Sequence, residues 1–104
     1  PDLRNTKVVD IIAELEDYGV TVMVHDPLAD AEEAHAYYGL TLQGFDALEK
    51  VDAVILSVAH AQYRQLGLKK LARLCVDGKA LFADVKGVFD PARAAAHNIT
   101  YWRL

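Results

Sequence analysis

The sequence predicts an α/β fold whose mostly parallel sheet is covered by helices, and two observations support this. Short runs of apolar, β-branched residues alternate along the chain with segments of helical periodicity, as they do in βαβ units. The chain has 104 residues, of which 53% are hydrophobic and 25% charged, so it suits one globular domain, residues 1–104.

The first two elements are an amphipathic helix over residues 6–19 and a buried strand over residues 20–25. The helix gathers its apolar residues on one stripe, and Gly19 suits a left-handed helix end. The stripe consists of Val8, Ile11, Ile12 and Leu15. The run VTVMVH that follows is almost wholly apolar, which is typical of a strand covered on both faces. Asp26-Pro27 ends it as a plain turn.

A second helix is expected over residues 30–39. Asp30 suits its N-cap, and Gly39 suits the residue that stops it. Residues 40–42 then suit a short edge strand, and residues 45–50 suit one or two helical turns.

The rest of the chain alternates strongly apolar strands with helices that carry clear boundary signals. Gly67 interrupts the helical pattern of residues 61–75, so we expect a broken helix there. Asp90 as N-cap and Pro91 at the first position open the last helix. The strands are expected over 52–58, 79–85 and 99–104, and the last helix over 91–98.

The composition excludes several classes of protein. A net charge of −4 argues against a general nucleic-acid binder, which needs a basic face. No apolar run is longer than residues 53–56, which is far too short to cross a bilayer. The single cysteine, Cys75, cannot form an internal disulfide, so we expect a cytoplasmic protein. The chain begins at Pro1 rather than at a methionine, so we expect a piece of a longer protein.

Ligands of open α/β sheets bind beyond the carboxyl ends of the strands, and Lys86 is the most informative residue there. A lysine beside Gly87 offers a positive charge and an accessible backbone, a combination suited to phosphate. The alternative for a single lysine is an ordinary solvated loop residue. The polar residues after the other expected strands are His25, Asp26, His60 and Gln62.

Other site types are not expected within these residues. The glycines form no G-x-G-x-x-G pattern, so we do not expect this chain to bind NAD. The four histidines and Cys75 form no metal-ligand spacing, and Cys75 suits a buried, inert thiol. Ser57, His60 and Asp84 invite a catalytic triad, but no nucleophile elbow surrounds Ser57.

Four stretches of the chain resemble one known family. PDLRNTK, an apolar helix and then GVTVMVHDP look like the start of the C-terminal domain of the UDP-glucose/GDP-mannose dehydrogenase family. DAVILSVAHAQY and ADVKGVFD are similar to two later stretches of that domain, so the resemblance covers residues 1–90. Among subgroups it is strongest to the UDP-N-acetylhexosamine 6-dehydrogenases of polysaccharide biosynthesis.

The resemblance implies a Rossmann-like three-layer domain that binds the nucleotide of a UDP-sugar. The complete enzyme of this family oxidises the C6 hydroxyl of a UDP-hexose to a carboxylate with NAD. The resemblance places the NAD on a missing N-terminal domain, which a central helical domain joins to this one in a homo-oligomer. The fragment alone is expected to be inactive, and nothing in it matches the family's catalytic cysteine.

The resemblance also implies the site residues. Lys86 stands where relatives often have an arginine that contacts UDP, and Gly87 follows it. Arg4 matches the arginine of the family's D-x-R turn, close to the cleft between domains; by its position alone it also suits an exposed terminal residue. Relatives begin this domain with a strand upstream of Pro1, so we expect the sheet to lack its first strand and the fragment to bind nucleotide weakly or not at all.

Two other functions fit the same residues. A stand-alone nucleotide-binding or receiver-like regulatory module would use Asp26, Asp84 and Lys86, although a receiver pairs its acids after the first strand and this chain does not. A dimerisation domain would use the aromatic pairs Tyr37-Tyr38 and Tyr101-Trp102.

Overall fold

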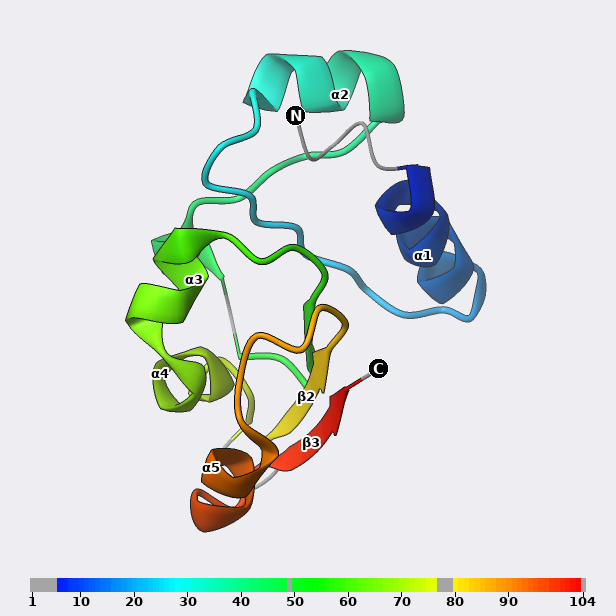
Figure 1. Ribbon diagram of the computed structural model, residues 1–104. Helices are drawn as coiled ribbons and strands as arrows, with labels where there is room; N and C mark the ends of the chain where they lie inside the picture. The colour runs from blue at the N-terminus through cyan, green and yellow to red at the C-terminus, as the bar shows by residue number, and fades with distance from the viewer. Residues whose placement is uncertain (1–5, 49, 77–79, 104) are drawn as a thin grey trace. The chain divides into compact units, whose positions relative to one another are not determined.

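The computed structural model describes residues 6–48, 50–76 and 80–103 (Figure 1). The chain divides into two compact units, residues 1–48 and residues 49–104. The second unit contains the sheet, and with it the strand ends at which the sequence predicts a site.

Unit 1, residues 1–48, is built on helices α1 (Thr6–Asp17) and α2 (Ala31–Tyr38), with a short 3₁₀ turn, η2 (Phe45–Ala47). Its core is the cluster of Ile12, Ala34 and Leu40, against which Val8 packs. The predicted apolar stripe of the first helix therefore faces inward only in part, because Ile11 is 37% exposed. Both predicted caps of α2 are present. The Asp30 carboxylate accepts from two amides of the first turn, and Gly39 has a left-handed φ of 67°.

The strands predicted over residues 20–25 and 40–42 do not form a ladder. Val24 and Leu42 make one isolated parallel bridge, supported by the Gln43 amide, which donates to the Val24 carbonyl at 2.8 Å. Val22 and Val24 instead pack on the core cluster of unit 1. A strand requires a paired neighbour, and among the described residues this segment has a partner only at that bridge. The two strand predictions are therefore wrong in extent.

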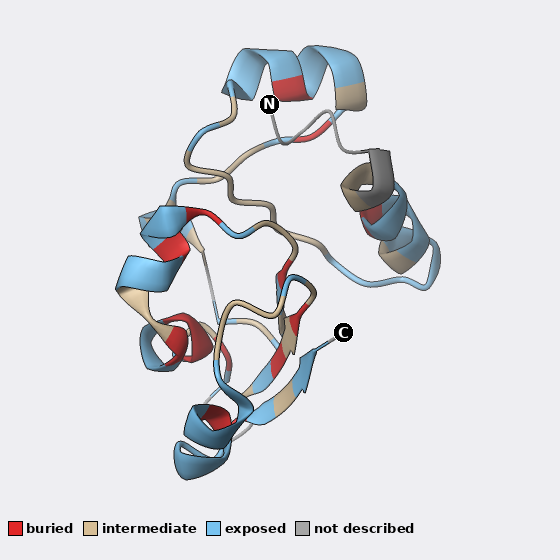
Figure 2. Ribbon diagram, in the orientation of Figure 1, coloured by how far each residue is buried: buried red, intermediate tan, exposed pale blue. Residues whose placement is uncertain are grey.

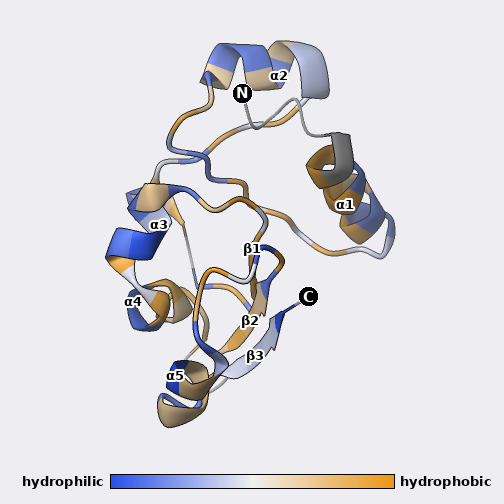
Figure 3. Cartoon of the chain, viewed as in Figure 1, coloured by the Kyte–Doolittle hydropathy of each residue, from blue (hydrophilic) through white to orange (hydrophobic). Residues whose placement is uncertain are grey.

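Unit 2, residues 49–104, contains a three-stranded sheet of order β1-β2-β3. Its strands are β1 (Val54–Leu56), β2 (Leu81–Asp84) and β3 (Thr100–Arg103). Both neighbouring pairs are parallel, which confirms the predicted α/β class and its parallel sheet. In Figure 3 β2 is orange and β3 is pale, as expected when β2 is central and β3 lies at an edge.

Helices connect each parallel pair of strands. Between β1 and β2 come α3 (Ala61–Leu66) and α4 (Leu68–Ala72), separated at Gly67 as predicted. Between β2 and β3 comes α5 (Pro91–Ala96), whose N-cap Asp90 accepts from the Ala92 amide at 2.9 Å. The connections from β1 to β2 and from β2 to β3 move across the sheet in the same direction. Because parallel crossovers have the same hand, both connections place their helices on one face of the sheet.

Alternation along the strands separates a buried face from an exposed one (Figure 2). Phe82 and Asp84 are both completely buried. Leu81, Ile55 and Trp102 occupy the alternate positions and are 43%, 42% and 53% exposed. Helices therefore cover one face of this sheet, and the opposite face of unit 2 presents apolar side chains.

Candidate functional site

The carboxyl ends of the three strands meet at one edge of the sheet in unit 2. Leu56 pairs with Asp84 and Asp84 pairs with Arg103, so the last residues of β1, β2 and β3 are neighbours. The loop of residues 85–90 leaves β2 here, and its first amide, that of Val85, donates to the Leu56 carbonyl at 2.9 Å. Because ligands of open parallel sheets bind at this edge, the loop is the candidate site.

The buried carboxylate of Asp84 holds the loop in place. It accepts hydrogen bonds from the amides of Val88, at 3.0 Å, and Phe89, at 2.9 Å. The hydroxyl of Tyr101 on β3 donates to the same carboxylate and also lies 3.1 Å from the Phe89 carbonyl. These contacts fold the chain after β2 back over the end of the sheet. The role of Asp84 is therefore to shape the site.

The electrostatics of this pair keep Asp84 ionised and Tyr101 neutral. Burial raises the pKa of the Asp84 carboxyl, but hydrogen bonds from Tyr101 and from the amides of Val88, Phe89 and Gly87 outweigh burial, and the net shift is downward. Burial, the hydrogen bond to Asp84 and the negative charge of Asp84 raise the pKa of Tyr101 to about 12. At neutral pH Asp84 is thus an ionised acceptor and Tyr101 its neutral donor.

Lys86 lies exposed in the loop that Asp84 anchors. In the part of the chain that the structure describes, its ammonium group makes no hydrogen bond or ion pair. The sequence indicated an accessible backbone beside it, but most of the loop amides already have partners. Four of them donate within the protein: those of Val85, Gly87, Val88 and Phe89. An anion at this site would therefore be held mainly by side-chain charge.

Gly87 brings a second cation to the loop. Its φ is +64°, and a β-carbon built on it would lie 2.9 Å from Nη2 of Arg103. Arg103 also donates from Nη1 to the Phe89 carbonyl at 3.2 Å. The guanidinium thus lies against the residue that follows Lys86, an arrangement suited to a doubly charged anion. Sequence reasoning missed Arg103, because only the register of β3 with β2 places it opposite Asp84.

The other residues named from the sequence have clear places. The Asp26 carboxylate accepts from the amides of Leu28 and Ala29, at 2.9 and 3.1 Å, which confirms the plain turn. Cys75 is 2% exposed, which confirms that it is buried, and its thiol lies 3.7 Å from the Leu81 carbonyl. Arg4 lies outside the described residues, so its expected role stays a prediction.

The described residues contain neither a cluster of metal ligands nor a helix that could span a membrane. No group of three or more His, Cys, Asp or Glu side chains in 6–48, 50–76 and 80–103 could hold a metal ion. No helix in the same ranges has the length and apolar character needed to cross a membrane.

Comparison with known proteins identifies the family. Residues 1–91 match the model of the UDP-glucose/GDP-mannose dehydrogenase family, UDP binding domain. The chain belongs to this family. The match crosses the division between units 1 and 2 and includes the whole loop of residues 85–90, whereas β3 and Arg103 lie beyond it. The resemblance of residues 1–90 to this family is thereby confirmed.

Relatives within the UDP-glucose/GDP-mannose dehydrogenase family are similar over most of this chain. The UDP-N-acetyl-D-glucosamine 6-dehydrogenase of Pseudomonas aeruginosa is 42% identical over 86% of the chain and 21% of its own length. Protein CapL of Staphylococcus aureus is 42% identical over 100% of the chain and 24% of its own length. The UDP-N-acetyl-D-glucosamine 6-dehydrogenase of Salmonella typhi is 35% identical over 85% of the chain.

The chain spans between a fifth and a quarter of the length of these relatives. No solved structure matches it significantly. The relatives' names favour the dehydrogenase interpretation over the receiver-like and dimerisation alternatives.

Proposed function

We propose that residues 1–104 are the UDP-sugar-binding C-terminal domain of an NAD-dependent UDP-sugar 6-dehydrogenase. The observation that carries this proposal is the loop after β2. Within a chain of this family, it carries Lys86 at the carboxyl end of a parallel sheet and sets the next residue, Gly87, against the Arg103 guanidinium. Two adjacent cations suit the diphosphate of a sugar nucleotide.

Each residue of the loop has a distinct part in this proposal. Lys86 contacts the diphosphate through its free ammonium group, and Arg103 adds a planar donor beside Gly87. Gly87 contributes chiefly by lacking a side chain, because its amide donates to the Asp84 carbonyl at 3.2 Å. Asp84 and Tyr101 hold the loop in shape without touching the ligand.

The strand-to-helix turns of the sheet in unit 2 lack the glycine pattern that typically holds the diphosphate of NAD. The turn from β1 into α3, residues 57–60, contains no glycine, and the one glycine of the loop after β2 has its amide engaged. In our proposal NAD is bound by another domain of the intact protein. The proposed role of this chain is to bind and orient the UDP-sugar, which lowers the entropic barrier of a reaction that takes place on that other domain.

The intact protein of this proposal converts the C6 hydroxyl of a UDP-hexose, most simply a UDP-N-acetylhexosamine, to a carboxylate. Its partners are the N-terminal NAD-binding and central helical domains of the same chain, within a cytoplasmic homo-oligomer. Arg4, by its match to the D-x-R turn, lies at the cleft between domains in this arrangement.

Titration of UDP into the intact protein tests the proposal. The dissociation constant of UDP, and KM for the UDP-sugar, should rise by roughly ten- to a hundredfold in Lys86→Ala, because one charge-assisted hydrogen bond contributes about 1.5–3 kcal/mol. A Lys50→Ala variant is the control, since this exposed lysine precedes β1 and therefore lies at the opposite end of the strands. Equal affinity of the wild type and Lys86→Ala would remove Lys86 from the site.

A further inference from the structure

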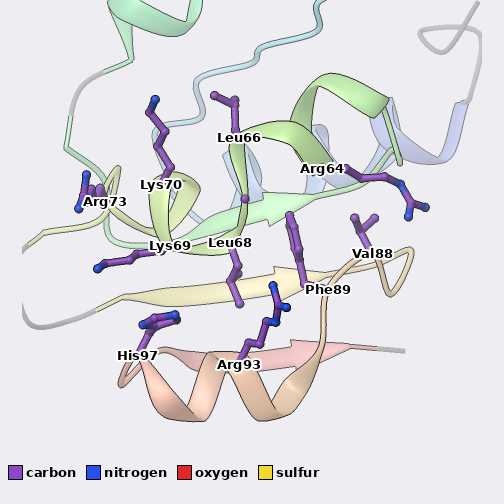
Figure 4. A pocket seen from close by; sticks show the side chains of 11 residues that line it. Arg64, Leu66, Leu68, Lys69, Lys70, Arg73, Val88, Phe89, Arg93 and His97 are labelled. Carbon is purple, nitrogen blue, oxygen red and sulfur yellow. The ribbon is translucent and has the colours of Figure 1, made fainter.

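Unit 2 contains a groove that the proposed UDP site does not use. It has a volume of about 540 Å³ and lies between the α3–α4 segment and α5, with Val88 and Phe89 at one side (Figure 4). Lys86 is not among the residues that line it. The groove therefore offers a second place where a ligand of small-molecule size could bind.

Every ionisable side chain that the structure describes in the lining of this groove is basic. The set consists of Arg64, Lys69, Lys70, Arg73, Arg93 and His97. All six are exposed, and no carboxylate from residues 6–48, 50–76 or 80–103 joins them. Such a concentration of one sign of charge raises the local potential and attracts anions.

The charge of the chain is strongly divided between the two units. Residues 1–48 contain ten acidic and two basic residues, a net charge of −8, whereas residues 49–104 contain five acidic and nine basic residues, a net charge of +4. The basic groove thus forms against an overall charge of −4. The net charge of the whole chain therefore does not predict a basic groove, whereas the net charge of residues 49–104 is consistent with one.

The floor of the groove is apolar and well packed. Leu68 is only 5% exposed, and the half-buried Phe89 ring meets Phe82 edge to face at a centroid distance of 6.0 Å. Arg93 rises from α5 toward Phe89 and Leu68 (Figure 4). A cation directed over an apolar floor suits a ligand with both a charged and an uncharged part.

We propose that this groove binds a small organic polyphosphate, a molecule with two or more phosphate groups and an uncharged body. Several phosphate oxygens can bridge cations that otherwise repel one another, which a single monoanion cannot do. Arg93 accepts one phosphate in the middle of the groove, and Lys69 binds the charge on the α4 side. The uncharged body rests on Leu68 and Phe89.

Protection of Lys69 from acetylation tests the proposal in the intact protein. The rate of acetylation at Lys69 is followed by mass spectrometry against increasing pyrophosphate or ATP, without UDP, because UDP is itself an organic polyphosphate. Acetylation of Lys69 reports only on ligand bound beside this lysine, so nucleotide bound at the strand ends does not change the measured rate. Both probes should slow acetylation, and ATP should act at the lower concentration because its body contacts the apolar floor.

Arg93→Glu and Lys86→Glu form a matched pair of charge reversals. Arg93→Glu should raise the midpoint of protection about tenfold or more, and Arg93→Gln should raise it less, because a charge-assisted contact is lost in both and repulsion is added only in the first. Lys86→Glu should leave the midpoint unchanged while weakening UDP binding. The groove proposal and the UDP-site proposal can therefore be contradicted independently of each other. Thermal unfolding of Arg93→Gln checks that the fold is intact.

Three results would overturn the proposal. They are absence of protection by either probe, equal protection of the wild type and Arg93→Glu, and protection that grows with protein concentration and disappears in salt without any probe. The last result would instead assign the groove to the acidic unit of a second copy. Protection by pyrophosphate that ATP does not improve would overturn the part of the proposal that concerns the uncharged body.

Discussion

The hydroxyl of Tyr101 donates a hydrogen bond to the buried carboxylate of Asp84 on the neighbouring strand. This bond and the two from the amides of Val88 and Phe89 connect the edge strand to the loop after β2. The shape of the proposed UDP site thus depends on a pair of residues that do not contact the ligand.

Tyr101→Phe is therefore expected to destabilise the chain. A completely buried carboxylate loses its side-chain donor, which costs about 1.5–3 kcal/mol of the free energy of unfolding. Urea unfolding measures the loss. Tyr37→Phe is the matched control, since Tyr37 is 76% exposed and should tolerate the change. An equal effect of the two substitutions would show that the hydrogen bond contributes nothing.

The dependence of stability on pH should follow the same two groups. The pKa of Asp84 is lowered below its ordinary value of 3.8, so its contribution is present above that pH and is lost as the pH falls through the folded value. The pKa of Tyr101 is raised from 10.0 to about 12, so its contribution is present below pH 10 and is lost as the pH rises toward 12.

Unfolding measured across the pH range checks both signs. Asp84→Asn should flatten the acid limb of the curve below about pH 4, because an amide does not ionise. Tyr101→Phe should flatten the alkaline limb above pH 10. If both variants keep the wild-type slopes in acid and in alkali, other ionisable groups determine how the free energy of unfolding depends on pH.

Gly87→Ala should damage both stability and UDP binding. Gly87 has a φ of +64°, and an alanine with this φ destabilises the fold by roughly 1–2 kcal/mol. The new β-carbon also displaces the Arg103 guanidinium. Gly44→Ala is the control, because Gly44 has a φ of −65° and no atom near the position of a β-carbon. Urea unfolding and UDP titration should show a lower free energy of unfolding and a higher dissociation constant for Gly87→Ala than for Gly44→Ala. Equal values for the two variants would show that position 87 does not require a glycine.

Arg103→Ala should weaken UDP binding more than it affects the fold. Arg103 is exposed, and its one hydrogen bond within the described part of the chain goes to the Phe89 carbonyl. The Asp84 contacts would still hold the loop. We expect UDP affinity to fall about tenfold and the free energy of unfolding to change by less than about 1 kcal/mol. A loss of stability without a loss of affinity would make Arg103 structural only.

Local signals explain why part of this fold could be predicted. Gly67 between two helices, Asp90 as a cap and Pro91 at the first helical position are properties of a few adjacent residues, and each is found where the sequence indicated it. The strands of unit 2 were apolar runs between such signals. The position of Lys86 at the edge of the sheet could be predicted in the same way, because a residue that directly follows a strand lies close to the end of that strand.

The missed features all depend on pairing between distant segments. Tyr101 and Asp84 are 17 residues apart, and only the register of β2 with β3 brings them together. Arg103 reaches Gly87 for the same reason. Residues 20–25 have a strand-like composition, but composition does not supply a partner, and the segment keeps a single bridge at Val24.

Alternation along the sheet leads to a final prediction, about Trp102 and Phe82. They occupy opposite faces, since Phe82 is completely buried and Trp102 is 53% exposed on the face without helices in unit 2. Phe82→Ala should cost about 3–5 kcal/mol of the free energy of unfolding, because it leaves a cavity under α3–α5. Trp102→Thr should cost less than about 1 kcal/mol, because threonine suits a strand and little buried area is lost. Urea unfolding of the two variants measures the difference, and a cost for Trp102→Thr near that of Phe82→Ala would mean that the exposed face is covered in solution.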